Sequence, residues 1–122
     1  MARILIAEDD RAVREFVSRA LEHRGHSVHA VEDGLAAVER LNVEPFDLLV
    51  SDIVMPGMDG IALALKAGRD WPRMRILLMT GFAHERQRAH NLEALGQRVV
   101  SKPFTLQEIC GAVEATLERK EG

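Results

Sequence analysis

The sequence predicts an α/β fold: a doubly wound, five-stranded parallel sheet with helices on both faces, in which residues 1–122 form one domain. Five short apolar runs, rich in branched side chains, alternate with segments whose apolar residues recur at helical spacing. The units are about 20 to 28 residues long, which is typical of right-handed βαβ crossovers. A chain of 122 residues can bury a proper core but leaves no residues for a second domain.

The first half of the chain predicts three strands and two helices. Asp10 is a candidate N-cap of the first helix and Gly25 its stop, and the Asp33-Gly34 pair indicates a turn or cap before the second. The third strand runs straight into Asp52 and then into a loop rich in Pro and Gly. The strands cover residues 3–7, 27–31 and 46–52, and the helices cover residues 11–24 and 35–44.

The second half predicts two further strands and three helices. The segment 82–95 is polar and poorly patterned, which predicts a weakly anchored helix. Thr105 and Glu108 fit a capping box at the start of the last helix. We expect that helix to bury a stripe formed by Leu106, Ile109, Val113 and Leu117. The strands cover residues 74–79 and 98–101, and the helices cover residues 61–68, 82–95 and 105–117.

Polar side chains follow four of the predicted strands. Pairing between the strands does not require these side chains. The carboxyl ends of parallel strands share one edge of a sheet, where ligands bind, so these groups should converge. Carboxylates brought close together repel one another, and a hard cation such as Mg²⁺, held by a few protein oxygens and by water, would relieve the repulsion. The residues concerned are Glu8, Asp9, Asp52, Thr80 and Lys102.

Asp52 is the predicted phosphoryl acceptor at this edge. A carboxylate nucleophile forms an aspartyl phosphate, and a neighbouring metal ion neutralises charge on the transferring group. Lys102 would then pair with a phosphoryl oxygen, and Thr80 would donate a hydroxyl hydrogen bond to it. Because phosphorylation adds negative charge, both side chains would be drawn inward, and the helix at 82–95 would be the element most easily displaced.

The composition narrows the choice of partners. A net charge of −3 gives no electrostatic reason to expect binding to nucleic acid or to a membrane surface. No apolar run is long enough to span a bilayer and no signal peptide or lipidation motif is present, so we expect a cytoplasmic protein. The single Cys110 precludes an internal disulfide.

Four motifs, in this order, resemble the receiver domain of two-component response regulators. They are Glu8-Asp9-Asp10, Asp52 with Met55-Pro56 and Asp59-Gly60, Thr80-Gly81, and Lys102-Pro103-Phe104. The resemblance covers essentially the whole chain and implies a CheY-like, flavodoxin-like fold with sheet order 2-1-3-4-5, five helices and no output domain. It also implies phosphorylation by a sensor histidine kinase or a histidine phosphotransfer protein. No enzyme activity is expected beyond the domain's part in its own phosphorylation and dephosphorylation.

The acidic run offers two possible pairs of metal ligands. Counting back from Arg14, which resembles the family's helix-one arginine, selects Glu8 and Asp9 and leaves Asp10 as the helix cap. The resemblance then implies that Asp9 ligates Mg²⁺ directly and that Glu8 does so mainly through water.

The remaining roles follow the same resemblance. Asp52 matches the phospho-acceptor, and the backbone carbonyl of Val54 matches the third protein ligand of the metal. Thr80 and Lys102 match the switch hydroxyl and the phosphate-pairing lysine. The peptide bond between Lys102 and Pro103 is expected to be cis.

The sequence departs from the family pattern at two places. Val99 stands where an aromatic side chain often reports phosphorylation, which places that readout in doubt. Val54 and Phe82 stand where family members position the hydrolytic water, and both are apolar. We therefore hypothesise slow self-dephosphorylation, and a phosphoryl half-life of seconds would contradict this.

Two rival functions of other classes fail at their own motifs. An aspartate-based phosphohydrolase of the haloacid-dehalogenase type needs a second acid two residues after its nucleophile, where this chain has Val54. A flavodoxin needs a Ser/Thr/Gly-rich phosphate loop after the first strand, where this chain has three acids.

Within signalling, three roles stay open: phosphorelay intermediate, phosphate sink and allosteric binder of a target. A narrower resemblance, to stand-alone receivers that prime the ClpXP protease when unphosphorylated, favours an adaptor. The expected contact face comprises the fourth helix, the fifth strand and the last helix. The narrower resemblance rests on residues 1–10, 15–21, 31–34, 59–65 and 77–82.

Overall fold

A five-stranded parallel sheet of order β2-β1-β3-β4-β5 forms the centre of the molecule, as expected. The computed structural model describes residues 1–81, 90–91, 93 and 98–118. The strands are β1 (Arg3–Ala7), β2 (Ser27–Val31), β3 (Leu48–Asp52), β4 (Arg75–Thr80) and β5 (Arg98–Ser101).

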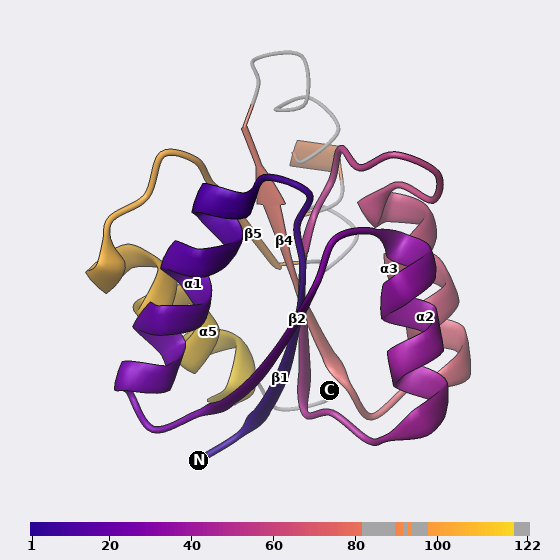
Figure 1. Cartoon of the computed structure of the whole chain (residues 1–122), viewed down its shortest axis with the longest axis horizontal. Coiled ribbons are helices and arrows are strands. Elements are labelled where there is room, and N and C mark those ends of the chain that lie inside the picture. The colour runs from indigo at the N-terminus through magenta and orange to yellow at the C-terminus, as the bar shows by residue number, and fades with distance from the viewer. Residues whose placement is uncertain (82–89, 92, 94–97, 119–122) are drawn as a thin grey trace.

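Helices cover both faces of the sheet, with α1 and α5 on one side and α2 and α3 on the other (Figure 1). The described residues therefore contain four of the five expected helices. The remaining one, expected at 82–95, falls outside the described residues except at positions 90, 91 and 93, which are helical. The four helices are α1 (Arg11–His23), α2 (Gly34–Val43), α3 (Gly60–Asp70) and α5 (Leu106–Glu118).

The central strands are buried on both faces because helices cover each side. Along β1, Ile4 and Ile6 pack into the cluster under α1 and α5, whereas Leu5 and Ala7 pack into the cluster under α2 and α3. This alternation is the two-residue period of a strand. Because side chains on both faces of the sheet are packed against helices, the ends of the strands are held in fixed positions.

Capping side chains fix where the helices begin, as predicted for Asp10, Asp33 and Thr105. Asp10, Asp33 and Asp59 each accept hydrogen bonds from backbone N–H groups in the first turn of the helix that follows. Thr105 and Glu108 form the capping box, with reciprocal hydrogen bonds of 2.9 and 3.1 Å. These helices all begin at the carboxyl end of the sheet, so the caps also shape the loops that surround the candidate site.

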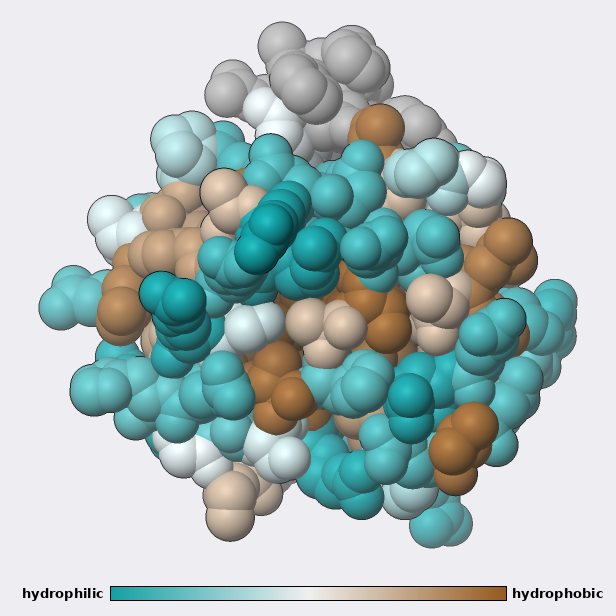
Figure 2. Space-filling view, in the orientation of Figure 1, coloured by the Kyte–Doolittle hydropathy of each residue, from teal (hydrophilic) through white to brown (hydrophobic). Residues whose placement is uncertain are grey.

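The expected buried stripe of α5 is wrong at Leu106, whose relative exposure is 40%. Leu106 is the first residue of α5, and it lies beside the groove between α1 and α5 rather than over the sheet. Phe16 lines the same groove and is 41% exposed. Apolar side chains are visible in this region, over α1 and the segment that leads to α5 (Figure 2). The buried positions of α5 are Ile109, Cys110, Val113 and Thr116.

Candidate active site

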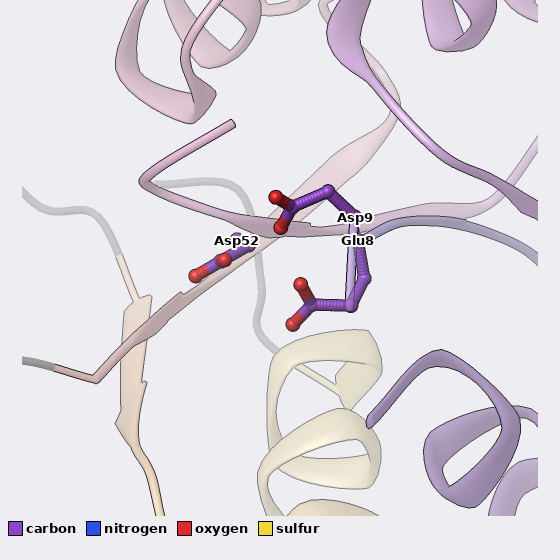
Figure 3. A group of neighbouring side chains, drawn as sticks. All are labelled: Glu8, Asp9 and Asp52. Carbon is purple, nitrogen blue, oxygen red and sulfur yellow. The ribbon is translucent and has the colours of Figure 1, made fainter. Parts of the chain in front are cut away.

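The carboxyl end of the sheet brings the predicted acidic residues together. Glu8 and Asp9 follow β1, and Asp52 is the last residue of β3, the neighbouring strand. One carboxylate oxygen from each of the three lies within 4.8 Å of the others. The three carboxylates lie near one another at this edge of the sheet (Figure 3). The expected convergence of these carboxylates is confirmed.

Lys102 bridges the two buried carboxylates. Glu8 is fully buried and Asp52 is 6% exposed, while Asp9 is exposed. The Lys102 Nζ lies 2.6 Å from Glu8 Oε1 and 3.3 Å from Asp52 Oδ1. A single cation is thus shared between two carboxylates, with the shorter contact to Glu8.

Burial and charge act on these groups in opposite directions. Burial, joined by the negative charge of Asp52, raises the pKa of Glu8 from 4.5 to about 7, although hydrogen bonds from Lys102 and the Asp10 N–H oppose the shift. For Lys102, burial lowers the pKa, but the hydrogen bond to Glu8 and the charges of Asp52 and Glu8 outweigh it and raise the pKa. Glu8 is therefore protonated more readily than an exposed glutamate, and Lys102 gives up its proton less readily than an exposed lysine.

Backbone groups fix the position of Asp52. The Ile53 N–H donates to Asp52 Oδ1 at 3.0 Å, and Ser51 Oγ donates to the Asp52 carbonyl at 3.0 Å. The Gly60 N–H closes the following loop by donating to the Ile53 carbonyl at 2.8 Å. A Cβ at Gly60 would overlap the Asp52 carbonyl oxygen and lie 2.9 Å from Ile53 Cα. The need for glycine at position 60 could not be foreseen from the sequence, in which Gly60 was only part of a family motif.

Thr80 and Lys102 stand at the ends of the next two strands. Thr80 is the last residue of β4 and is 2% exposed. The Lys102 N–H donates to the Thr80 carbonyl at 2.7 Å, which ties the two positions together. The peptide bond between Lys102 and Pro103 is cis, as expected.

The structure describes two of the three residues at which the sequence departs from the family pattern. Val54 is 44% exposed, and the metal-ligating role of its carbonyl stays a prediction. Val99 is half-buried in β5 and packs beside Ile53 and Leu78. Phe82 lies outside the described residues.

Arg14 contacts the acidic loop in a way that sequence reasoning did not foresee. Its Nη1 donates to the Glu8 carbonyl at 2.8 Å and approaches the Asp9 carbonyl at 3.4 Å. In the sequence, Arg14 served only to align the acidic pair with the family. The sequence did contain a signal for this contact. Arg14 lies in the first turns of a helix that directly follows the acidic residues, which places it within reach of their backbone.

An apolar groove of about 530 Å³ opens beside Asp52 and Lys102. Val13, Phe16 and Phe104 line it, and the two phenylalanine rings stack with centroids 6.4 Å apart at an interplanar angle of 26°. The site is therefore open to a partner on the side of α1 and the start of α5.

Residues 4–114 match the family of response regulator receiver domains. The chain belongs to this family. As a receiver domain it is part of two-component signal transduction, and receiver domains bind Mg²⁺ at an acidic pocket of the kind formed here by Glu8, Asp9 and Asp52. Among the described residues, no helix is both long and apolar enough to cross a membrane.

Relatives of two kinds are similar to this receiver. The response regulator receiver protein CpdR of Brucella abortus is 44% identical over 117 residues, which cover 96% of this chain and 98% of CpdR. Response regulator MprA of Mycobacterium avium is 34% identical over 96% of this chain, which spans about half (51%) of the length of MprA. The solved structure of response regulator TrrA from Thermotoga maritima, in complex with Mg²⁺-BeF, superimposes with a TM-score of 0.83 at 27% identity, covering 95% of this chain and 99% of TrrA.

Proposed function

We propose that this receiver accepts a phosphoryl group on Asp52 from a sensor histidine kinase or a histidine phosphotransfer protein. The observation that carries the proposal is the setting of Asp52: a nearly buried carboxylate at the end of a central strand, beside two further carboxylates and within 3.3 Å of the Lys102 ammonium. A structural aspartate does not require this excess of negative charge, whereas a phosphoryl acceptor assisted by a metal does.

The donor set fits Mg²⁺. Glu8, Asp9 and Asp52 offer hard carboxylate oxygens in small number, which leaves room for water ligands, and the Val54 carbonyl is the further ligand that we propose. When bound, Mg²⁺ would neutralise negative charge on the transferring phosphoryl group. The complex of the similar TrrA with Mg²⁺-BeF supports this assignment.

Lys102 is the residue that we propose to respond to phosphorylation. It is held more closely by Glu8, at 2.6 Å, than by Asp52, at 3.3 Å. Phosphorylation adds negative charge and acceptor oxygens at Asp52, so the ammonium would leave Glu8 for a phosphoryl oxygen. The Thr80 hydroxyl would donate to a second oxygen. Because Lys102 directly follows β5 and precedes α5, its movement would alter the surface that these elements present.

The groove beside the site suits a protein phosphodonor. Val13, Phe16 and Phe104 give it an apolar wall next to Lys102 and Asp52. We propose that a helix carrying the phosphohistidine packs here, so that the donor phosphorus reaches Asp52 while apolar contacts exclude water.

Intact-mass measurement after incubation with acetyl phosphate, with and without Mg²⁺, tests the proposal. The expected result is one phosphoryl adduct, dependent on Mg²⁺, that is lost in Asp52→Asn. Asp47→Asn is the matched control, because Asp47 is an exposed carboxylate just before the same strand, and it should be phosphorylated like the wild type. Wild type without an adduct, or an adduct that survives in Asp52→Asn, would contradict the proposal.

We further propose that the unphosphorylated receiver acts as an adaptor of the ClpXP protease. The observation that favours this over a relay is the 44% identity to CpdR across nearly the full length of both chains. Purified ClpX should bind the untreated protein and lose it after treatment with beryllofluoride, which mimics the phosphoryl group. Phosphoryl transfer to a phosphotransfer protein without any binding to ClpX would instead favour a relay.

A further inference from the structure

Glu8 and Asp9 are consecutive residues, yet both side chains extend toward Asp52 (Figure 3). In a continuing strand, consecutive side chains would point to opposite faces of the sheet. The backbone must therefore leave strand geometry after Ala7, which is where β1 ends. The convergence of the two carboxylates depends on how that departure is held in place.

Arg14 contacts the departing backbone directly. Its Nη1 donates to the Glu8 carbonyl at 2.8 Å and approaches the Asp9 carbonyl at 3.4 Å. The Arg14 backbone is itself fixed in α1, where its N–H donates to the Asp10 carbonyl at 2.9 Å. One planar guanidinium on a rigid helix thus faces two successive peptide carbonyls.

The other contacts in this loop act on different atoms. The Asp10 N–H donates to Glu8 Oε2 at 3.1 Å, and the Asp10 side chain caps α1. The Glu8 N–H donates to the Val31 carbonyl at 3.1 Å. Among the residues that the structure describes, Arg14 is the one that orients the peptide groups of Glu8 and Asp9 through their carbonyl oxygens.

We propose that Arg14 is a positioning residue that orients the carboxylates of Glu8 and Asp9 for a divalent cation. This inference rests on the proposed metal site and deepens it. Arg14 acts through the backbone carbonyls, and it does not touch the cation or the phosphoryl group.

The sign of the effect separates positioning from charge. Arg14 is a fixed cation near an acidic site, so Coulomb repulsion alone predicts that its removal tightens the binding of Mg²⁺. Positioning predicts the opposite, because carboxylates that are no longer held must be ordered by the metal. Loss of an outer contact of this kind typically weakens metal binding about tenfold or more.

Three variants provide the test. Arg14→Gln removes the charge and the fork of donors, and Arg14→Lys keeps the charge with a single point of contact. Arg11→Gln is the matched control, because Arg11 lies on the same helix, is 83% exposed and pairs with Glu15 at 3.0 Å. Titration with MgCl₂ in a calorimeter, without phosphodonor, should give a Kd raised about tenfold for Arg14→Gln, an intermediate Kd for Arg14→Lys and less than a twofold change for Arg11→Gln.

A kinetic readout completes the test. The rate of phosphorylation of Arg14→Gln by acetyl phosphate should be low at limiting Mg²⁺ and return to the wild-type rate at saturating Mg²⁺. A rate that stays low at saturation would overturn the positioning role. Thermal unfolding checks that each variant is folded. If Arg14→Gln does not fold, Arg14→Lys is compared with the wild type instead.

The outcomes for metal binding are distinct. An unchanged or lower Kd in Arg14→Gln, with normal binding by the wild type, would overturn this inference and leave the metal site intact. Absence of Mg²⁺ binding by the wild type would overturn both. Equal weakening by Arg14→Gln and Arg11→Gln would show that the effect does not depend on the carbonyl contacts of Arg14, and it would overturn the positioning role.

Discussion

The two ends of the sheet carry charged side chains in contrasting arrangements. At the amino end, Arg3 pairs with Glu44 at 2.7 Å, its N–H donates to Asp47 at 2.8 Å, and its guanidinium lies 5.6 Å from the centre of the Phe46 ring. The Arg3 and Glu44 side chains are 48% and 29% exposed. The charged groups at this end are therefore both paired and partly exposed to solvent.

At the carboxyl end, negative charge is in excess and largely buried. Glu8 and Asp52 share Lys102, and Asp9 adds a third carboxylate. Burying like charges costs stability unless a cation compensates it. The comparison teaches that the carboxyl end, where we propose that a metal ion and a phosphoryl group bind, concentrates buried charge at the expense of stability. The amino end carries no such cost.

The largest expected difference in the free energy of unfolding is between substitutions at two glycines of α3. Gly60→Ala, at the carboxyl end, should lower the free energy of unfolding by about 3 kcal/mol, because its Cβ would overlap the Asp52 carbonyl. Gly68→Ala, whose Cβ would meet nothing within 4 Å, should raise it by about 0.5 to 1 kcal/mol. Urea unfolding of both variants measures this. A Gly60→Ala protein as stable as the wild type would contradict the close packing at the site.

A smaller difference in the free energy of unfolding is expected between substitutions at two lysines. Lys102→Met leaves two buried carboxylates without their cation and should cost about 2 kcal/mol in the absence of Mg²⁺. Lys66→Met breaks an ion pair with Asp70 at 2.8 Å between side chains about one-third exposed, and should cost less than about 0.5 kcal/mol. Added Mg²⁺ should restore part of the loss in Lys102→Met only. If chemical unfolding showed the same loss of stability in Lys102→Met and Lys66→Met, the contrast between the two ends of the sheet would not hold.

An expected effect of similar size is a pH dependence that belongs to Glu8. Between pH 4.5 and about 7 the unfolded chain releases the Glu8 proton while the folded protein retains it, because its pKa is raised. The free energy of unfolding should therefore fall as pH rises through this window and then level off. Relative to Glu8→Gln, we expect a fall of about 2 kcal/mol between pH 5 and pH 8 without Mg²⁺. A difference between the wild type and Glu8→Gln that stays flat or rises with pH would refute the raised pKa of Glu8.

Much of the fold could be predicted because its signals are local. Apolar runs define the strands, and Asp10 and Asp33 define where helices begin. The residues at the strand ends followed from these boundaries, since parallel strands share a carboxyl edge. The order of the strands did not follow from local pattern and came from the family resemblance.

What could not be predicted depends on contacts between distant residues and on side-chain direction. Glu8 and Lys102 are separated by 94 positions, and nothing local indicates that the ammonium lies closer to Glu8 than to Asp52. Helical spacing placed Leu106 on the buried face of α5 but could not show that the first turn lies beside the groove with α1. The reach of Arg14 back to two carbonyls depends on how the loop turns, which residue type does not reveal.

Locating the phosphoryl group in the chain is the most direct test of the role of Asp52. Reduction of the phosphorylated protein with borohydride converts an aspartyl phosphate to homoserine, which tandem mass spectrometry of peptides assigns to a single position. We predict homoserine at position 52, with Asp47 of the same region unchanged as an internal control. Homoserine at Asp9 or Asp10, or none under conditions that phosphorylate another receiver, would contradict phosphorylation at Asp52.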